Sequence, residues 1–429
     1  IAVIFAMYPQ SVLAVWVEVP IAIYLGYLIY KKGANIMTWS IYAVIAMYVC
    51  VFLGPYLPFK MPAIAGIPPT GVWTIILMTY AFIASILPVT TLLQPRDCIN
   101  SHQLVIAMAL LMLGVLVASF GSNLNIVAPA VQTTPAEAPP MWPFLFITIA
   151  CGAISGFHSL VSSGTSAKQV RNENDALFVG YGSMLMEGAL ATLVIIAVAA
   201  GIGMGYTTKA GETLTGVAAW STHYASWAAA AGLGSKIAAF VDGSANMIMT
   251  LGISKQFTLA IMAVFVASFA GTTLDTATRI QRYVIGELGQ SLKLNFLSDR
   301  YVATAVAVGS ALILAFATGA SGNGALKLWP LFGAVNQTLA ALALIIITLY
   351  LKSKNGMKWL VAGVPAVFMS VMTIWALVMN QFIFGTAHNG LLQIVNLIIL
   401  VIAVWIAIEG LIKFFSPTHI AEEPSPAAM

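Results

Sequence analysis

Eleven long apolar runs dominate this sequence and leave few architectures open to it. They lie near residues 11–30, 38–55, 72–93, 103–121, 142–162, 176–204, 256–284, 301–319, 328–351, 358–380 and 391–415. A transmembrane helix needs about 20 mostly apolar residues, and helices satisfy their own backbone hydrogen bonds in lipid. The sequence therefore predicts an all-α, polytopic membrane helix bundle with about eleven spans.

Composition supports this class and excludes several others. Hydrophobic residues make up 60% of the chain and charged residues 7%, whereas soluble domains carry about 25% charged residues. A soluble globular enzyme, a disordered chain and a nucleic-acid-binding protein are therefore excluded. The lipid bilayer is the expected partner.

The segments outside the runs predict the topology. Residues 1–7 are apolar and are expected to be the end of a transmembrane helix that starts upstream, so that the transporter-like region covers 1–415 and a tail covers 416–429. Segment 205–255 is glycine-rich and is expected to carry short or re-entrant helices. Counted loop by loop, 13 Lys and Arg residues fall on one side and 5 on the other. By the positive-inside rule the tail is cytoplasmic and 205–255 lies outside.

The stretch from Cys151 to Ser166 has the strongest polar pattern inside a predicted span. Serines recur there at three- and four-residue spacing, which places them on one helix face beside His158. Three glycines in the stretch permit bending or unwinding, and broken helices expose backbone groups to substrates in transporters. Serines alone are more often packing residues, but an imidazole can carry a proton near neutral pH. The candidate pathway residues are Ser155, His158, Ser159, Ser162 and Thr165.

A second polar face lies in the span at 256–284. Thr272, Asp275, Thr276 and Arg279 share this face, and Asp275 and Arg279 are spaced as an i,i+4 ion pair. A structural ion pair and a role in ion or proton coupling are equally open for it. Both hold if the pair breaks during transport.

Glu187 is a lone carboxyl group in the middle of a predicted span. Unless it is paired, it is expected to be protonated there. It is either a proton-relay residue or a neutral hydrogen-bond donor to a neighbouring helix. Glu18 lies nearer the end of a span and is expected to snorkel or pack.

Five further residues mark helix breaks or gates. Pro88 interrupts the run at 72–93 and predicts a kink or a discontinuous helix. Arg96 is expected to anchor a cytoplasmic helix end, with a gate-forming pair with Asp97 as the alternative. Asn336 and Gln337 are expected to hydrogen-bond across helices.

No catalytic or metal-binding motif accompanies these residues. The sequence lacks HExxH, GxSxG, a phosphate-binding P-loop and a Cys/His cluster, so no catalytic residue, cofactor or metal is predicted.

Several of these segments resemble the carbon starvation protein A (CstA) family of bacterial inner-membrane transporters. The resemblance is carried in order by LPVTTLLQPRD (87–97), PFLFITIACGAISGFHSLVSSGT (143–165), GYGSMLME (180–187), LDTATR (274–279) and LWPLFGAVNQ (328–337). It implies a secondary transporter that imports peptides or pyruvate during carbon starvation, driven by protons. It also implies a fold of two inverted five-helix repeats. The family's upstream glycine-rich motif, similar to HFxAIxGAGP, is absent, so the chain is expected to lack an N-terminal part.

Two other functions remain open at this stage. An intramembrane enzyme would need two carboxyl groups, such as Asp97, Asp275 or Glu187, to converge in one hydrated site. A membrane nutrient sensor would usually carry a soluble signalling domain, and none is visible. Proton-coupled symport in the bacterial inner membrane is the favoured hypothesis, with a small-molecule substrate, protons as the coupling ion and no nucleic-acid partner.

Overall fold

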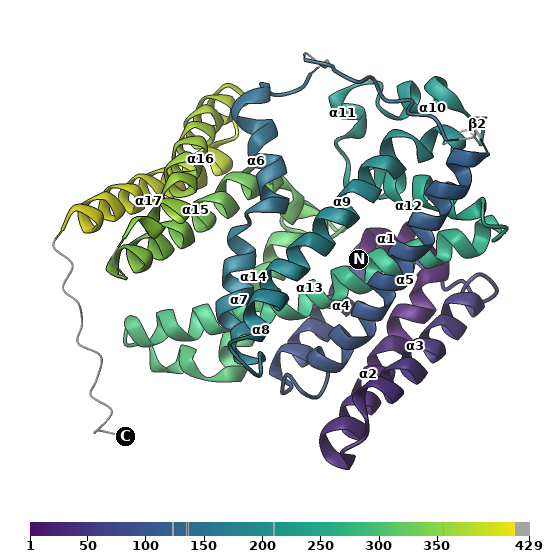
Figure 1. Cartoon of the computed structure of the whole chain (residues 1–429), viewed down its shortest axis with the longest axis horizontal. Helices are drawn as coiled ribbons and strands as arrows, with labels where there is room; N and C mark the ends of the chain where they lie inside the picture. Colours follow the sequence, from purple (N-terminus) through teal and green to yellow (C-terminus); the bar gives the residue numbers. More distant parts are fainter. Residues whose placement is uncertain (122–123, 134, 136, 209–210, 355, 417–429) are drawn as a thin grey trace. The chain divides into compact units, whose positions relative to one another are not determined.

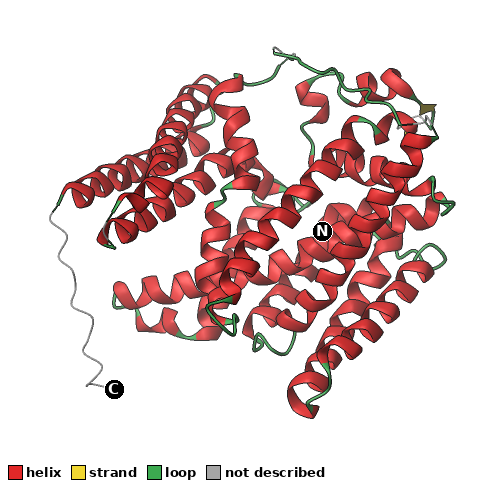
Figure 2. Ribbon diagram, viewed as in Figure 1, coloured by secondary structure: helices red, strands yellow, loops and turns green. Residues whose placement is uncertain are grey.

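Helices make up most of the chain in the computed structural model (Figure 2). The structure describes residues 1–429 except 122–123, 134, 136, 209–210, 355 and 417–429. The described residues form two compact units. Unit 1 contains 1–138 and 177–326, and unit 2 contains 139–176 and 327–429.

Unit 1 holds most of the long helices. Its α-helices are α1 (Ala2–Met7), α2 (Val12–Lys32), α3 (Ile36–Leu53), α4 (Pro69–Ile86), α5 (Leu93–Phe120), α9 (Ser183–Ala199), α10 (Gly216–His223), α11 (Trp227–Ala230), α12 (Leu233–Met249), α13 (Lys255–Ser291) and α14 (Arg300–Phe316). Its short 3-10 helices are η1 (Pro9–Ser11), η4 (Gly201–Met204) and η5 (Asn295–Ser298), and the π-helical turn η3 (Phe178–Gly182) precedes α9. Strands β1 (Tyr206–Thr207) and β2 (Thr213–Leu214) form a small antiparallel hairpin.

Unit 2 contains two short helices and a bundle of three long ones. These are α6 (Met141–Ala153), α7 (Gly156–Gly164), α15 (Trp329–Ser353), α16 (Leu360–Thr386) and α17 (Gly390–Phe415), with the 3-10 turns η2 (Ser166–Lys168) and η7 (Met357–Trp359). The short helix α8 (Asp175–Leu177) and the turn η6 (Gly324–Leu328) lie where the chain passes between the units (Figure 1).

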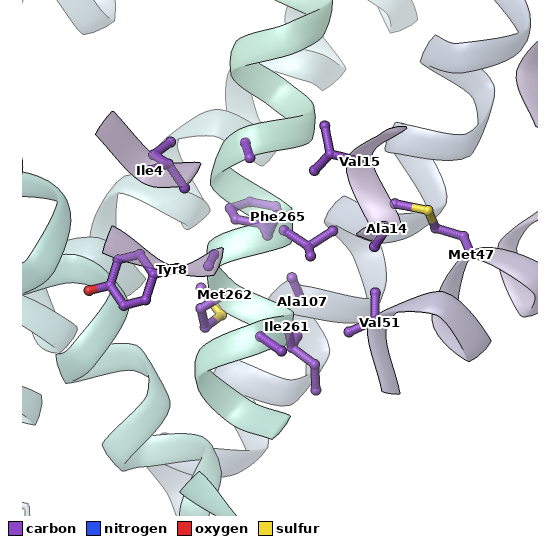
Figure 3. Packing of buried hydrophobic residues seen from close by; sticks show 14 of the residues in the cluster. Ile4, Tyr8, Ala14, Val15, Met47, Val51, Ala107, Ile261, Met262 and Phe265 are labelled. Carbon is purple, nitrogen blue, oxygen red and sulfur yellow. The ribbon is translucent and has the colours of Figure 1, made fainter. Parts of the chain in front are cut away.

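Helix α13 is the centre of unit 1. Its 37 residues would extend about 55 Å at 1.5 Å per residue, well beyond the roughly 30 Å hydrocarbon core of a bilayer. It is also the most buried candidate span, at 56% of its most apolar window. Ile261, Met262 and Phe265 of α13 pack against residues from α1, α2, α3 and α5 (Figure 3).

The predicted class of fold is confirmed, with ten candidate spans where about eleven were predicted. Among the described residues, ten helices are long and apolar enough to cross a membrane, and the shorter α14 corresponds to the eleventh predicted run. Segment 205–255 contains the hairpin and helices α10 to α12. The chain is therefore an all-α, multi-pass membrane protein apart from the four residues of the hairpin.

Two predicted boundaries were wrong. The interruption predicted at Pro88 is present, because α4 ends at Ile86 and Pro88 lies in the turn that follows it, so the helix ends at 86 and not at 93. Helix α5 begins at Leu93, ten residues before the predicted start at 103. The run at 142–162 breaks between α6 and α7, where Ile154 and Ser155 leave the helical conformation, as the glycines of this stretch allow.

Candidate functional site

The central polar feature of unit 1 is a buried arginine between two carboxyl groups. Arg96 is only 1% exposed although it lies in the first turn of α5. Its Nε donates to Oε1 of Glu18 over 3.2 Å, and its Nη1 donates to Oδ2 of Asp275 over 3.0 Å. Nη1 also donates to the hydroxyl of Tyr80 over 2.8 Å, and this hydroxyl donates to the same Asp275 oxygen over 2.7 Å. Helices α2, α4, α5 and α13 thus meet at one charged cluster, which we call the Arg96 cluster (Glu18, Tyr80, Arg96, Asp275).

The local sequence explains how this arginine reaches the interior. Pro88 lies in the turn between α4 and α5, so α5 restarts at Leu93 and carries Arg96 inward. Gly271 on α13 then leaves space for the guanidinium group, because a Cβ at this position would lie 2.4 Å from Nη2 of Arg96. Gly26 on α2 has a similar role toward the turn, since its Cβ would lie 2.8 Å from the carbonyl oxygen of Thr90.

The carboxyl groups of Glu18 and Asp275 differ in how many of their oxygens accept a hydrogen bond. Oε1 of Glu18 accepts from Arg96, and Oε2 accepts from Ser268 over 2.7 Å. Oδ2 of Asp275 accepts from Arg96 and Tyr80. Oδ1 of Asp275 is buried and has no hydrogen-bond partner among the described residues. Three of the four carboxyl oxygens are therefore satisfied, and the fourth is free to hold a proton.

The charges of the Arg96 cluster do not cancel when both acids are ionised. Two carboxylates then face one guanidinium group within the four hydrogen-bonded residues, while the buried Arg279 and Arg282 on α13 add positive charge to the same interior. An uncompensated buried charge is costly in a low-dielectric environment.

Further polar groups extend from the cluster along α5 and α13. Nδ2 of Asn100 donates to Oγ1 of Thr272 over 2.5 Å. Oδ1 of Asn100 and Oε1 of Gln103 are buried without a partner in the part of the chain that the structure describes. Because Arg96, Asn100 and Gln103 recur at helical spacing, one face of α5 carries polar groups toward α13.

The predicted pairing of Asp275 with Arg279 was wrong. Nη2 of Arg279 instead donates to the carbonyl oxygens of Ala84 and Leu87, over 3.0 and 2.8 Å. Arg282 donates to the carbonyl oxygen of Ser85 over 2.8 Å. These carbonyls belong to the last turn of α4, which has no helical N–H partners and carries the negative end of the helix dipole. Two arginines therefore cap the end of α4, and Asp275 pairs with Arg96 across helices.

The expectation that Arg96 anchors a helix end was also wrong, and of the two alternatives for Glu18, snorkelling or packing, the structure excludes snorkelling. Arg96 is not an anchor at the membrane surface, and Glu18, at 0% exposure, does not snorkel. The two side chains form an ion pair with each other in the interior, so neither charge has to extend to water. Asp97 is half-buried beside the cluster, and its gate-forming pair with Arg96 is not among the ion pairs of the described residues. Thr276 is buried close to the cluster on α13.

In unit 2, Asn336 holds the break between α6 and α7. Its Oδ1 accepts from the backbone N–H of Phe157 over 2.8 Å, and its side chain exchanges hydrogen bonds with Ser155. Gly156 allows this close approach, because a Cβ there would lie 2.2 Å from the carbonyl oxygen of Asn336. The predicted bond of Asn336 across helices is thus present. Gln337 is fully buried, and neither polar atom of its side chain has a partner among the described residues.

The predicted polar face at 155–166 is divided by this break. Ser155 is buried and precedes α7, so it does not continue the helical face. Ser159 and Ser162 donate to the backbone of their own helix, which is the packing role that serines alone were expected to have. His158 is exposed, and Thr165 is buried just after the end of α7.

Glu187 and the Tyr8–Asp242 contact lie in unit 1 away from the cluster. Glu187 is exposed in the second turn of α9, the helix that follows the π-helical turn η3. The hydroxyl of Tyr8 donates to Oδ1 of Asp242 over 3.2 Å. Burial raises the pKa of Asp242, although this hydrogen bond and the charge of Lys255 partly oppose the increase. Asp242 lies in α12, outside the candidate spans.

Comparison with known proteins identifies the family. Residues 1–376 match the family model described as carbon starvation protein CstA. The chain belongs to the CstA family. A peptide transporter CstA of Helicobacter pylori is 30% identical over 434 residues, covering 90% of this chain and 62% of that protein. The pyruvate/proton symporter BtsT of Escherichia coli is 32% identical, covering 87% of this chain and 60% of BtsT.

This chain matches a larger share of the length of a third relative. The peptide transporter CstA of Bacillus subtilis is 28% identical over 97% of this chain and 73% of that protein. No solved structure matches the chain. The chain spans 62% of the length of the Helicobacter relative and 60% of the length of the Escherichia relative.

Proposed function

We propose that this protein is a proton-coupled secondary transporter that imports peptides or pyruvate when carbon is scarce. Membership of the CstA family and the names of its relatives support this class of substrate. The observation that carries the proposal is the Arg96 cluster, which places two carboxyl groups and one arginine inside apolar spans. Ionisable groups are rare at such positions and mark ion pathways or proton relays in transporters.

Asp275 is the proton carrier in this proposal, and Oδ1 is the atom that receives the proton. Contact with Arg96 and Tyr80 stabilises the ionised carboxylate through Oδ2. When the transport cycle separates α5 from α13, the carboxylate loses its cation. An isolated charge in a low-dielectric environment is costly, so Asp275 takes up a proton and releases it when Arg96 returns. Thr272 and Thr276 lie on the same helix and line the proposed proton pathway. Arg279 holds this helix, α13, against the end of α4.

A separate group of proposed pathway residues lies in unit 2. The break between α6 and α7 supplies backbone groups and Ser155, and Asn336 and Gln337 lie on the helix that packs against it. His158 and Glu187 are alternative proton-relay residues, and Ser159, Ser162 and Thr165 belong to the same candidate pathway. The broken helix fits the general pattern of transporter sites.

The proposed cellular setting follows from charge distribution and family. The protein lies in the bacterial inner membrane with the segment after 415 in the cytoplasm and 205–255 outside. The Lys and Arg excess on one side supports this orientation. A transporter rather than an intramembrane enzyme is supported by the arginine between Glu18 and Asp275, because each acid bonds the cation instead of sharing a proton with the other.

Uptake by the purified protein in proteoliposomes tests the proposal. Labelled pyruvate and labelled dipeptides are supplied separately under an imposed proton gradient, with and without a protonophore. Accumulation that collapses with the gradient is expected for one of the two substrates. Absence of gradient-driven uptake for both classes would reject the proposed function.

Asp275→Asn tests the role of the carrier. It should abolish accumulation above the external concentration while leaving exchange of substrate across the membrane. The matched control is Asp299→Asn, which changes an exposed N-cap of α14 to a residue that caps equally well. If Asp275→Asn accumulates substrate with an unchanged pH profile, Asp275 is structural, and coupling must be sought at His158 or Glu187.

A further inference from the structure

Unit 2 contains an apolar groove that the proposed transport pathway does not use. It has a volume of about 410 Å³ and is lined by residues of α15, α16 and α17, together with Trp359 before α16. We call it the α15–α17 groove. All of its lining residues belong to unit 2, so it is a feature of one compact unit.

Small residues create the groove, and larger apolar residues form its open side. Gly363, Ala366 and Gly410 line it where the helices would otherwise present bulky side chains. Val367 and Val371, one turn apart on α16, are 61% and 57% exposed. The groove is therefore open to the surroundings of the helices, which for a membrane span is lipid.

Apart from the indole N–H of Trp359, the described lining residues offer no free polar side chain to a ligand. The lining contains no ionisable side chain, and its only hydroxyl groups are those of Thr348 and Ser370. Both donate to the backbone of their own helices, over 2.7 and 2.8 Å. The part of an occupant that lies in the groove must therefore be apolar.

One end of the groove is strongly basic. The Nζ of Lys352 lies 4.3 Å from the ring centroid of Phe414 and donates to the carbonyl oxygen of the same residue. Phe414 in turn contacts Trp359 with ring centroids 4.9 Å apart, and both aromatic residues line the groove. The lysines at this end of the three helices are Lys352, Lys354, Lys358 and Lys413. The nearest acid in the sequence is Glu409, one turn before Lys413 on α17.

We propose that the α15–α17 groove binds an anionic phospholipid, with an acyl chain along the groove and the phosphate against these lysines. The apolar lining fits the acyl chain and excludes a polar ligand. The phosphate supplies the negative charge that the four lysines lack locally, and basic pockets between transmembrane helices are suited to such headgroups. One N–H of the Lys352 ammonium group is used by Phe414, so two remain for phosphate oxygens. Trp359 lies at the level where the apolar groove meets the basic end, as aromatic residues do at a membrane interface.

Lipid binding to the full chain can be measured directly. The protein is reconstituted in equal mixtures of phosphatidylglycerol and phosphatidylcholine and transferred to detergent, and the lipids that stay bound are counted by native mass spectrometry. Retention of phosphatidylglycerol over phosphatidylcholine is expected. The preference should weaken at high salt, because ions screen the lysine–phosphate attraction.

Matched substitutions test the groove and the charges separately. Val371→Trp fills the groove from an exposed position and should lower the retained phosphatidylglycerol. Val364→Trp, 62% exposed on the same helix and outside the lining, should not. Lys352→Gln and Lys413→Gln should each lower the preference by about fivefold. Lys327→Gln, before the other end of α15, should leave it unchanged.

Three results would overturn the proposal. Equal retention of the two lipids would show that the lysines do not recognise a headgroup. Equal effects of Val371→Trp and Val364→Trp would show that the lipid does not occupy the groove. Phosphatidylglycerol that binds only after removal of residues 417–429 would make this tail the occupant. If Val371→Trp fails to fold, the lysine substitutions still test whether the basic end of the groove recognises the headgroup.

Discussion

Gly271→Ala is the sharpest test of the Arg96 cluster, because it adds a single methyl group beside the guanidinium. The new Cβ would lie 2.4 Å from Nη2, 3.0 Å from Cζ and 3.2 Å from Nη1 of Arg96. Ordinary contacts begin at 3.4 Å. The guanidinium must therefore move by about 1 Å, since close-packed interiors leave no spare volume. This movement breaks the bonds of Nη1 to Asp275 and Tyr80, which are 3.0 and 2.8 Å long.

The expected cost follows from two opposing contributions. Breaking one side of a buried ion pair costs about 3–5 kcal/mol. Replacing glycine by alanine inside a helix stabilises it by about 1 kcal/mol. The net loss of unfolding free energy is therefore about 2–4 kcal/mol, and the thermal midpoint should fall accordingly.

Gly286→Ala supplies the matched control on the same helix. The nearest atom to a Cβ at Gly286 is the carbonyl oxygen of Leu297, 3.8 Å away, so only the gain in helix propensity remains. Thermal unfolding of both variants in detergent, followed by circular dichroism, gives the difference directly. If Gly271→Ala is as stable as Gly286→Ala, Arg96 is not held against α13 and the Arg96 cluster is wrongly described. Proton-driven uptake should also be lost in Gly271→Ala and kept in Gly286→Ala.

Four further predictions concern other parts of the molecule. Asn336→Leu removes the acceptor of the Phe157 N–H, so it should destabilise the protein by about 1–3 kcal/mol in thermal unfolding. Gln337→Leu removes two buried groups without partners among the described residues and should be neutral or stabilising; a larger loss than that of Asn336→Leu would contradict this reasoning. Burial raises the pKa of Asp242, so its ionisation costs stability as pH rises through the folded-state pKa. Asp242→Asn should therefore raise the thermal midpoint at pH 7, and the gain should disappear in acid below the unfolded-state pKa; a constant gain at all pH values would refute this cause. With Cys50, Cys98 and Cys151 replaced, Thr213→Cys should react with an impermeant reagent from outside; labelling only from the cytoplasm would reverse the proposed orientation.

The class of fold could be predicted from the sequence because it depends on local composition. An apolar run of about 20 residues can satisfy its own backbone as a helix in lipid, and ten of the eleven runs contain a helix long enough to cross a membrane. The break at Gly156 and the turn at Pro88 were also visible, since glycine and proline act on the backbone within a few residues. The Lys and Arg distribution similarly gave an orientation without any tertiary information.

The Arg96 cluster shows what local patterns could not supply. Asp275 and Arg279 are four residues apart, and this spacing alone predicted their pairing. The actual partners of Asp275 are Arg96 and Tyr80, which are 179 and 195 residues away in the sequence. Glu18 and Arg96 likewise looked like residues at helix ends because each, taken singly, is too costly to bury.

Only the tertiary structure decides which charges meet. The sequence by itself determined that unit 1 would contain apolar helices with a few ionisable residues, because this depends on residue type and order. The packing of α2, α4 and α5 around α13 determined which of these residues form an ion pair and which cap a helix end. A buried charge is stable only beside its partner, and the partners here come from four helices that no local spacing connects.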